Sequence, residues 1–153
     1  MTLLYLSIPI ILTFHELEEW NILRWYKRHY IDPPPSDNLA VRTWILFCSL
    51  VGFLWTLISV WIPNNYLTAI LMSLLILVTI QNAIQHIYWQ IHFQAYSPGV
   101  IFSTIGLILG VFVIFKATKA GYLPIWLDLF LLIALIPTTI ETIRAKNTMT
   151  NQF

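Results

Sequence analysis

The chain has 153 residues, of which 58% are hydrophobic and only 10% are charged. A soluble domain carries about 25% charged residues, so this composition and the mean hydropathy of +0.75 predict a polytopic membrane protein. The net charge of +1 gives no reason to expect a nucleic-acid partner, and a single cysteine excludes an intrachain disulfide.

Five apolar segments, taken in chain order, predict five transmembrane helices in a single domain over residues 1–153. The first covers about residues 2–27 and is followed by three consecutive prolines at 33–35, which break a helix. The second covers about 40–62, the third about 66–94, the fourth about 100–118 and the fifth about 123–145. Each is near the ~20 residues that a helix needs to cross a bilayer. We therefore expect an all-α, polytopic membrane bundle of five transmembrane helices.

Basic residues near the ends of these segments predict the orientation. Six lie at the end of the bundle where the first, third and fifth segments finish: Arg24, Lys27, Arg28, Arg42, Arg144 and Lys146. Lys116 and Lys119 lie at the opposite end. Because Lys and Arg favour the cytoplasmic side, we expect the N-terminus outside and the C-terminus in the cytoplasm. Gly106 and Gly110, four residues apart, could serve either a homodimer or an internal helix contact.

Ionisable residues in the first segment are the strongest indication of a functional site. His15, Glu18 and Glu19 are spaced i, i+3 and i+4, so they share one face of a helix. Such side chains are costly at bilayer depth and usually face the protein interior with partners. Glu16 lies about 100° around the helix from His15 and need not face the same site.

Polar residues in two other segments reach a similar depth. At ~1.5 Å per residue, His15 and Glu19 lie roughly 20–26 Å from the outer end, Asn82 and His86 roughly 24–30 Å, and Glu141 about 28 Å. The first, third and fifth segments run in the same direction, so these groups could form one layer in the cytoplasmic half. The loop that contains Tyr96-Ser97-Pro98-Gly99 lies just beyond that layer.

Three patterns occur in order along the chain: His15-x-x-Glu18-Glu19, Asn82-x-x-x-His86 and Tyr96-x-Pro98-Gly99. Together they resemble the HXXEE family of small bacterial integral-membrane proteins, over about residues 10–120. The resemblance implies a shared site in a bacterial inner membrane, and it carries no established activity. Glu141 belongs to none of the three patterns, so its place in the site depends only on depth.

A divalent metal such as zinc is the first chemistry that these residues could support. Catalytic zinc sites often use two histidines and one carboxylate, and leave one position open for water. His15 and His86 could supply the nitrogens and Glu18 or Glu19 the oxygen, with the other glutamate as general base. Asn82 could orient the water or stabilise an oxyanion.

The depth of the site predicts its substrate. A membrane lipid or lipid-linked group is expected, because the site opens inside the bilayer, and the loop from Tyr96 to Gly99 could cap it. The first hypothesis is therefore a metal-dependent hydrolase or transferase that acts on such a lipid.

Two alternatives use the same residues without a metal. Buried carboxylates and histidines, with Glu141 and the aromatic ring of Trp89, could perform acid–base isomerase or cyclase chemistry on an isoprenoid-like lipid. The polar layer could instead be a non-enzymatic scaffold that holds the helices together, or part of a transport path. A scaffold gives no clear reason for two adjacent glutamates and two histidines, since Asn and Gln cost less to bury.

Overall fold

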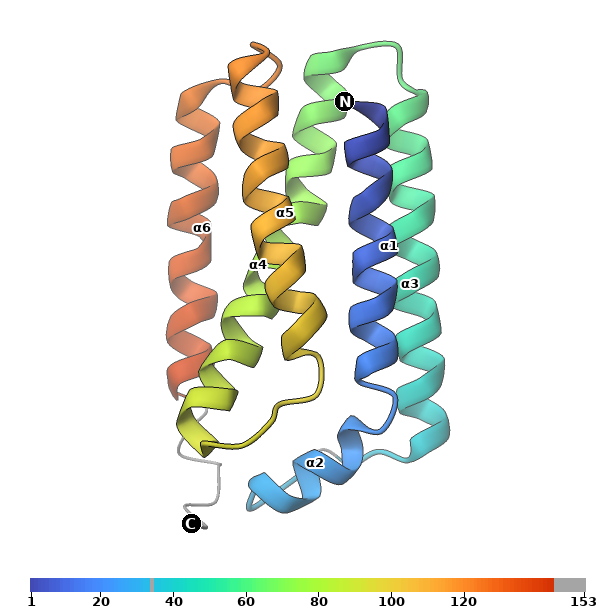
Figure 1. The fold of residues 1–153 in the computed structure, drawn as a ribbon, viewed down its shortest axis with the longest axis vertical. Helices are drawn as coiled ribbons and strands as arrows, with labels where there is room; N and C mark the ends of the chain where they lie inside the picture. The colour runs from blue at the N-terminus through green and yellow to red at the C-terminus, as the bar shows by residue number, and fades with distance from the viewer. Residues whose placement is uncertain (34, 145–153) are drawn as a thin grey trace.

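The computed structural model describes residues 1–33 and 35–144, and its elements over those residues are six helices (Figure 1). They are α1 (Thr2–Glu18), α2 (Ile22–His29), α3 (Asn38–Trp61), α4 (Asn65–Phe93), α5 (Val100–Lys119) and α6 (Ile125–Arg144). Four of them, α3 to α6, are long and apolar enough to cross a membrane. The prediction of an all-α fold is confirmed. Of the five predicted spans, the last four correspond to helices with the length and composition of a membrane span, whereas the first, in which α1 has 17 residues, does not. Residue 145, the predicted end of the last segment, and Lys146 lie outside the described residues.

The first predicted helix is wrong in extent, because the chain turns after Glu18 instead of continuing to residue 27. The turn at residues 19–21 separates α1 from the short helix α2, which lies across one end of the bundle (Figure 1). No proline or glycine marks this break in the sequence. Contacts with distant parts of the chain position both helices, and tertiary contacts of this kind override local helix propensity.

The long helices pack as a ring of four with one helix outside it. α1 packs against α3 and α5, α4 packs against α5 and α3, and α6 packs chiefly against α4 (Figure 1). The main apolar cluster lies where three helices of the ring meet, and it contains Tyr5 and Ile8 of α1, Met72 and Ile76 of α4, and Val113 of α5. α1 is thereby held inside the bundle, and its last turn reaches the same level as the second half of α4.

Gly106 and Gly110 serve an internal contact between α5 and α4. A Cβ atom at Gly106 would lie 2.8 Å from Thr79 Cγ2, and one at Gly110 would lie 2.9 Å from Ile76 Cγ2. Small residues permit this close approach of two membrane helices. Because the pair is used within the chain, the feature on which the homodimer expectation was based does not support a dimer.

Candidate functional site

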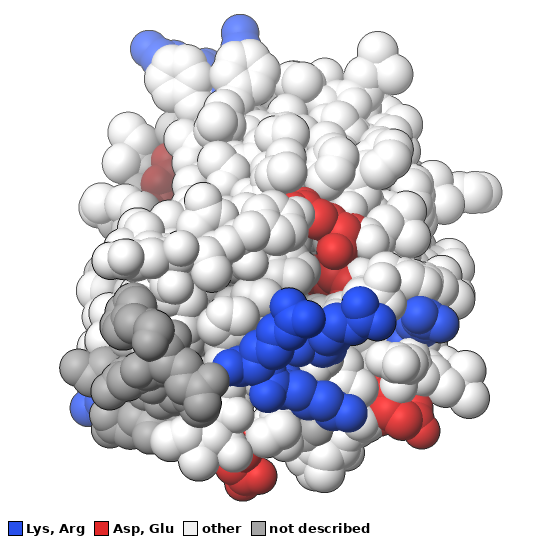
Figure 2. Space-filling view, turned by 60° about the horizontal axis from the view of Figure 1, so that its bottom comes forward, with Lys and Arg blue, Asp and Glu red and all other residues white. Residues whose placement is uncertain are grey.

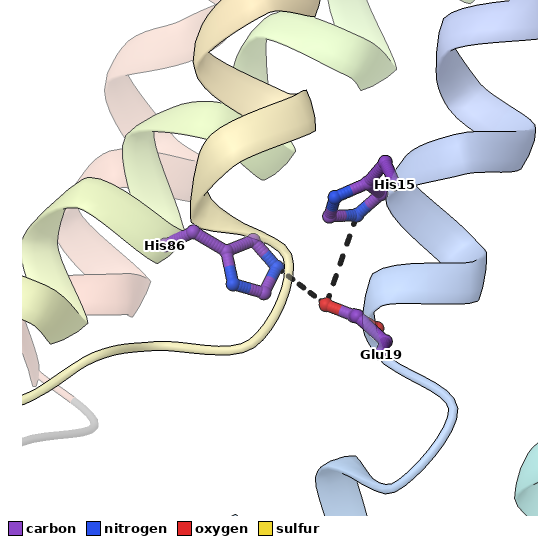
Figure 3. Close-up of side chains that lie close together, drawn as sticks. All are labelled: His15, Glu19 and His86. Carbon is purple, nitrogen blue, oxygen red and sulfur yellow. Dashed lines mark ion pairs between the residues drawn. The ribbon is translucent and has the colours of Figure 1, made fainter.

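Two histidines and one glutamate come together where α1 ends beside α4. Glu19 is the residue directly after α1, and its Oε1 atom lies 2.6 Å from Nε2 of His86 and 3.7 Å from Nε2 of His15. Figure 3 shows both imidazole rings directed toward the Glu19 carboxylate, one from each helix. Both histidines are 2% exposed, and the side chain of Glu19 is 16% exposed. The three ligand atoms lie within 4.8 Å of one another, as metal ligands do.

Hydrogen bonds hold His15 in one tautomer. Its Nδ1 atom lies 3.0 Å from the carbonyl oxygen of Gly99, and a carbonyl only accepts, so Nδ1 carries the proton. The amide of Asn82 donates to Nε2 over 2.9 Å, which is consistent with a lone pair there. The electron pair on Nε2 of His15 is therefore engaged by Asn82, and Oε1 of Glu19 lies 3.7 Å from the same nitrogen.

His86 is supported by the same loop. Its Nδ1 atom lies 3.2 Å from the hydroxyl of Ser97, which is fully buried. The edge of its ring meets Trp89, with ring centroids 5.0 Å apart. Each histidine thus presents Nε2 to Glu19 while a group of the loop between α4 and α5 holds its Nδ1 atom.

Gly99 permits the loop to pass directly over the cluster. Its φ of +94° lies in the left-handed region that favours glycine. A Cβ atom here would lie 2.7 Å from Cε1 of His15, 2.8 Å from Oε1 of Glu19 and 2.8 Å from Cε1 of His86. The space that a side chain would need is therefore occupied by all three members of the cluster.

Glu18 lies outside the cluster and caps α5 instead. Its carboxylate accepts hydrogen bonds from the backbone N–H groups of Ile101 (3.2 Å) and Phe102 (3.0 Å), and from the hydroxyl of Tyr96. A carboxylate at a helix N-terminus satisfies free N–H groups and complements the helix dipole. Partial burial and then the hydrogen bond to Glu18 raise the pKa of Tyr96 to about 12, so the phenol keeps the proton that it donates. Glu18 and Tyr96 therefore position the loop.

An aromatic cluster attaches α2 to the other side of this loop. The indole N–H of Trp25 donates to the carbonyl oxygen of Tyr96 over 3.1 Å, and its ring packs on Trp89 and Phe93 of α4. His29 lies on α2 and stacks on Trp25. Figure 2 shows Lys and Arg side chains gathered at this end of the molecule, with acidic side chains beside them.

Glu141 is not brought into the cluster. It lies on α6, its side chain is 72% exposed, and its carboxylate pairs with Arg144 over 3.3 Å. The layer expected from depth therefore includes α1 and α4 but not α6. His92 of α4 stacks on Tyr88 outside the cluster.

A cavity that sequence reasoning missed opens beside the cluster. It has a volume of about 710 Å³ and is lined by α1, α3, α4 and α6. Glu16, Glu19 and Asn82 lie in its wall, whereas the rest of the wall is mostly apolar. Glu16, which needed no role in the sequence interpretation, is 7% exposed and faces this cavity. The signal that could have found it was its place directly after His15, in the run of ionisable residues at 15–19.

The donor set fits a divalent ion such as zinc. Ligands about 2.0–2.1 Å from a tetrahedral zinc ion lie about 3.3 Å apart, between the 2.6 Å and 3.7 Å that separate Glu19 Oε1 from the two Nε2 atoms. Metal-binding histidines usually donate their second ring N–H to a carbonyl or another oxygen. Gly99 and Ser97 provide these oxygens. The arrangement also suits proton transfer, since Nε2 of His86 and Oε1 of Glu19 lie 2.6 Å apart.

Comparison with known proteins identifies one family. No curated protein and no solved protein structure gives a significant match to the chain. A family model described as a protein of unknown function with HXXEE motif matches residues 6–114, which is well over half of the chain. His15, Glu18 and Glu19 lie within that range and form the pattern of the family's name. The chain therefore belongs to the HXXEE family.

Proposed function

We propose that this protein is a divalent-metal-dependent membrane enzyme, a hydrolase or transferase that acts on a lipid or lipid-linked substrate. His15, Glu19 and His86 would hold the ion. One observation carries the proposal: two histidines present Nε2 to one oxygen of Glu19 while the loop holds both Nδ1 atoms. A network that served structure alone would have no need to bring two histidine Nε2 atoms and a carboxylate oxygen together at one point.

The residues around the ion would have different roles in the reaction. A bound zinc ion would supply a Lewis acid and a water molecule of lowered pKa. The carbonyl of Gly99 and the hydroxyl of Ser97 orient the two imidazoles. The backbone of Gly99 lies so close to the cluster that a side chain at this position would not fit. Asn82, which now donates to His15 Nε2, would be released when that nitrogen binds the ion, and its amide could then donate to a substrate oxygen. Glu16 lines the adjoining cavity and would meet the substrate there.

Metal content of purified variants tests the site. The full chain is purified through a tag without histidines, loaded with zinc, freed of excess metal and measured by mass spectrometry of the elements. We expect about one zinc per chain for the parent, and less than a tenth of that for His15→Ala and His86→Ala. His92→Ala is the matched control, because it removes a half-buried histidine of α4 outside the cluster. Equal zinc in all four proteins, or none in the parent, would exclude the metal site.

Catalysis is tested separately by turnover. The zinc-loaded protein in lipid nanodiscs is incubated with monooleoylglycerol, and released oleate is measured with and without a chelator. We expect release that the chelator abolishes and that added zinc restores. Release that is insensitive to the chelator would refute metal dependence, and its absence in the loaded protein would refute hydrolysis of this ester.

We further propose that α1 is a fifth membrane span, with the N-terminus outside a bacterial inner membrane and the last described turn of α6 in the cytoplasm. Support comes from α1 packing within the ring and from the excess of basic residues at the α2 end. In a Cys48→Ser background, a cysteine at Lys119 should react with an impermeant maleimide in intact cells, and one at Lys27 should not. The reverse labelling pattern would invert the orientation.

The short contact between His86 and Glu19 favours one alternative. A nitrogen and a carboxylate oxygen 2.6 Å apart share a proton, which suits metal-free acid–base chemistry on an isoprenoid-like lipid. A protein that contains no zinc and yet isomerises a lipid in the presence of a chelator would establish this function instead.

A further inference from the structure

The cavity beside the cluster has the size and position of a lipid-binding groove. Its volume of about 710 Å³ falls within the roughly 300–1,000 Å³ typical of small-molecule sites. α3 and α4 are joined by a short turn at one end and separate toward the other end, as Figure 1 shows. α1 lies in the wall between them, and α6 closes the far side. A groove between membrane helices is surrounded by lipid, so lipid chains are the molecules that reach it.

Most of the groove offers apolar surface to its occupant. Val51 and Trp55 of α3, Leu74 and Val78 of α4, and Leu135 of α6 lie in its wall. The amide of Gln81, although it lines the groove, already bonds with Thr138 and Thr142 of α6. An alkyl chain matches this part of the wall, because its burial removes no hydrogen-bonding group from a partner.

The polar end of the groove has an unused acceptor. Glu16 is 7% exposed, and within the described residues no hydrogen bond or ion pair reaches its carboxyl group. The carboxyl group is open to the groove, and a molecule that covers it there has to offer a donor, because a carboxyl group without a partner is costly to bury. A bound molecule with a hydroxyl group would supply that donor beside Glu19 and Asn82.

The charges around the groove limit what its polar end can accept. Among the described residues that line it, two are acidic and none is Lys or Arg. A phosphate group placed there would lie beside Glu16 without a cationic side chain, and burial of an unpaired anion is strongly unfavourable. The basic residues of α2 do not line the groove, and this helix is attached to the loop through Trp25.

We propose that this groove binds an uncharged single-chain lipid with a hydroxyl-bearing polar end, with its chain between α3, α4 and α6 and its hydroxyl at Glu16. The inference rests on the proposed function, because it names the substrate class of the same site. It excludes lipids whose head group is a phosphate. Monooleoylglycerol has the required chemistry, and its 3-phosphate has the same chain with the charge added.

Photo-crosslinking tests the groove. The full chain in nanodiscs is illuminated with monooleoylglycerol that carries a diazirine in its chain, and modified peptides are mapped by mass spectrometry. We expect crosslinks to the groove segments of α3 and α4, and a yield lower by about tenfold for the 3-phosphate. Val78→Trp fills the groove and should lower the yield at least about fivefold. Ile91→Trp, an exposed position of α4 outside the groove, is the matched control and should leave it unchanged.

The role of Glu16 is tested with Glu16→Leu, which should lower the crosslinking yield of monooleoylglycerol but leave that of a chain-matched alkane probe unchanged. Equal yields for the ester and its phosphate, or equal yields for Val78→Trp and the parent, would overturn the inference. The crosslinking is repeated after zinc removal, and zinc content is measured on the same samples. Crosslinking without zinc binding would refute the metal proposal alone, and zinc binding without crosslinking would refute the groove alone.

Discussion

Replacement of Gly99 by alanine tests whether the loop is fitted to the three clustered side chains. A Cβ atom at Gly99 would lie 2.7–2.8 Å from one atom each of His15, Glu19 and His86. Ordinary contacts begin near 3.4 Å, so each side chain would have to move by about 0.6–0.7 Å. Ligand distances in a metal site tolerate about 0.2 Å. We therefore expect the zinc affinity of Gly99→Ala, titrated against a competing chelator, to fall at least about tenfold.

Gly121 provides the matched control for this experiment. It also has a positive φ, +71°, but a Cβ atom there would meet nothing within 4 Å. Both alanine variants carry the backbone strain of about 1 kcal/mol, and only Gly99→Ala adds the collision with the cluster. Thermal unfolding of the metal-free proteins should therefore show Gly121→Ala slightly destabilised and Gly99→Ala more so. The reasoning is refuted if the two variants melt together and both bind zinc as the parent does.

Substitution of each of the two adjacent glutamates should distinguish a contribution to stability from a contribution to metal binding. Glu18→Gln removes the charge at the N-terminus of α5 but keeps an oxygen acceptor. We therefore expect the free energy of unfolding to fall by about 0.3–1 kcal/mol and the zinc content to stay unchanged. Loss of zinc at normal stability would contradict the capping role. Glu19→Gln should bind less than a tenth of the zinc while the metal-free protein melts within a few degrees of the parent. A large drop in its melting temperature would show instead that Glu19 holds the helices together.

Helix periodicity and depth could predict much of the site, because both follow from regular geometry. The i, i+4 spacing places His15 and Glu19 on one face, and the rise per residue places Asn82 and His86 at the same level. The structure brings these four side chains together. Depth does not specify rotation about a helix axis or which helix is the neighbour. For that reason depth alone predicted Glu141 in the layer, whereas its side chain lies on an exposed face of α6.

Glu16 and Glu18 show a second limit of sequence reasoning. The surroundings of Glu16 depend on how far α3 and α4 separate, and this separation is set by packing along the whole bundle. Glu18 meets N–H groups more than 80 residues away, in a helix whose start no local pattern connects to α1. The turn after α1 has the same origin, since residues 18 and 19 bind to α5 and α4 while Trp25 binds to the loop.

The three sequence patterns act as one interlocked unit in the structure. Glu18 accepts from Tyr96, Asn82 donates to His15, and His15 donates to the carbonyl of Gly99. Each pattern is therefore held by a residue of another.

Within this unit the two glutamates differ in how their carboxylates affect the stability of the fold. Glu18 is partly exposed and receives several hydrogen-bond donors at a helix N-terminus, an arrangement that stabilises the fold directly. Glu19 is largely buried between two imidazoles, where an amide would be cheaper to desolvate. A carboxylate at position 19 is therefore better explained by chemistry at the cluster than by stability. Of the pair, Glu18 positions the loop and α5, and Glu19 is the group on which the proposed metal binding depends.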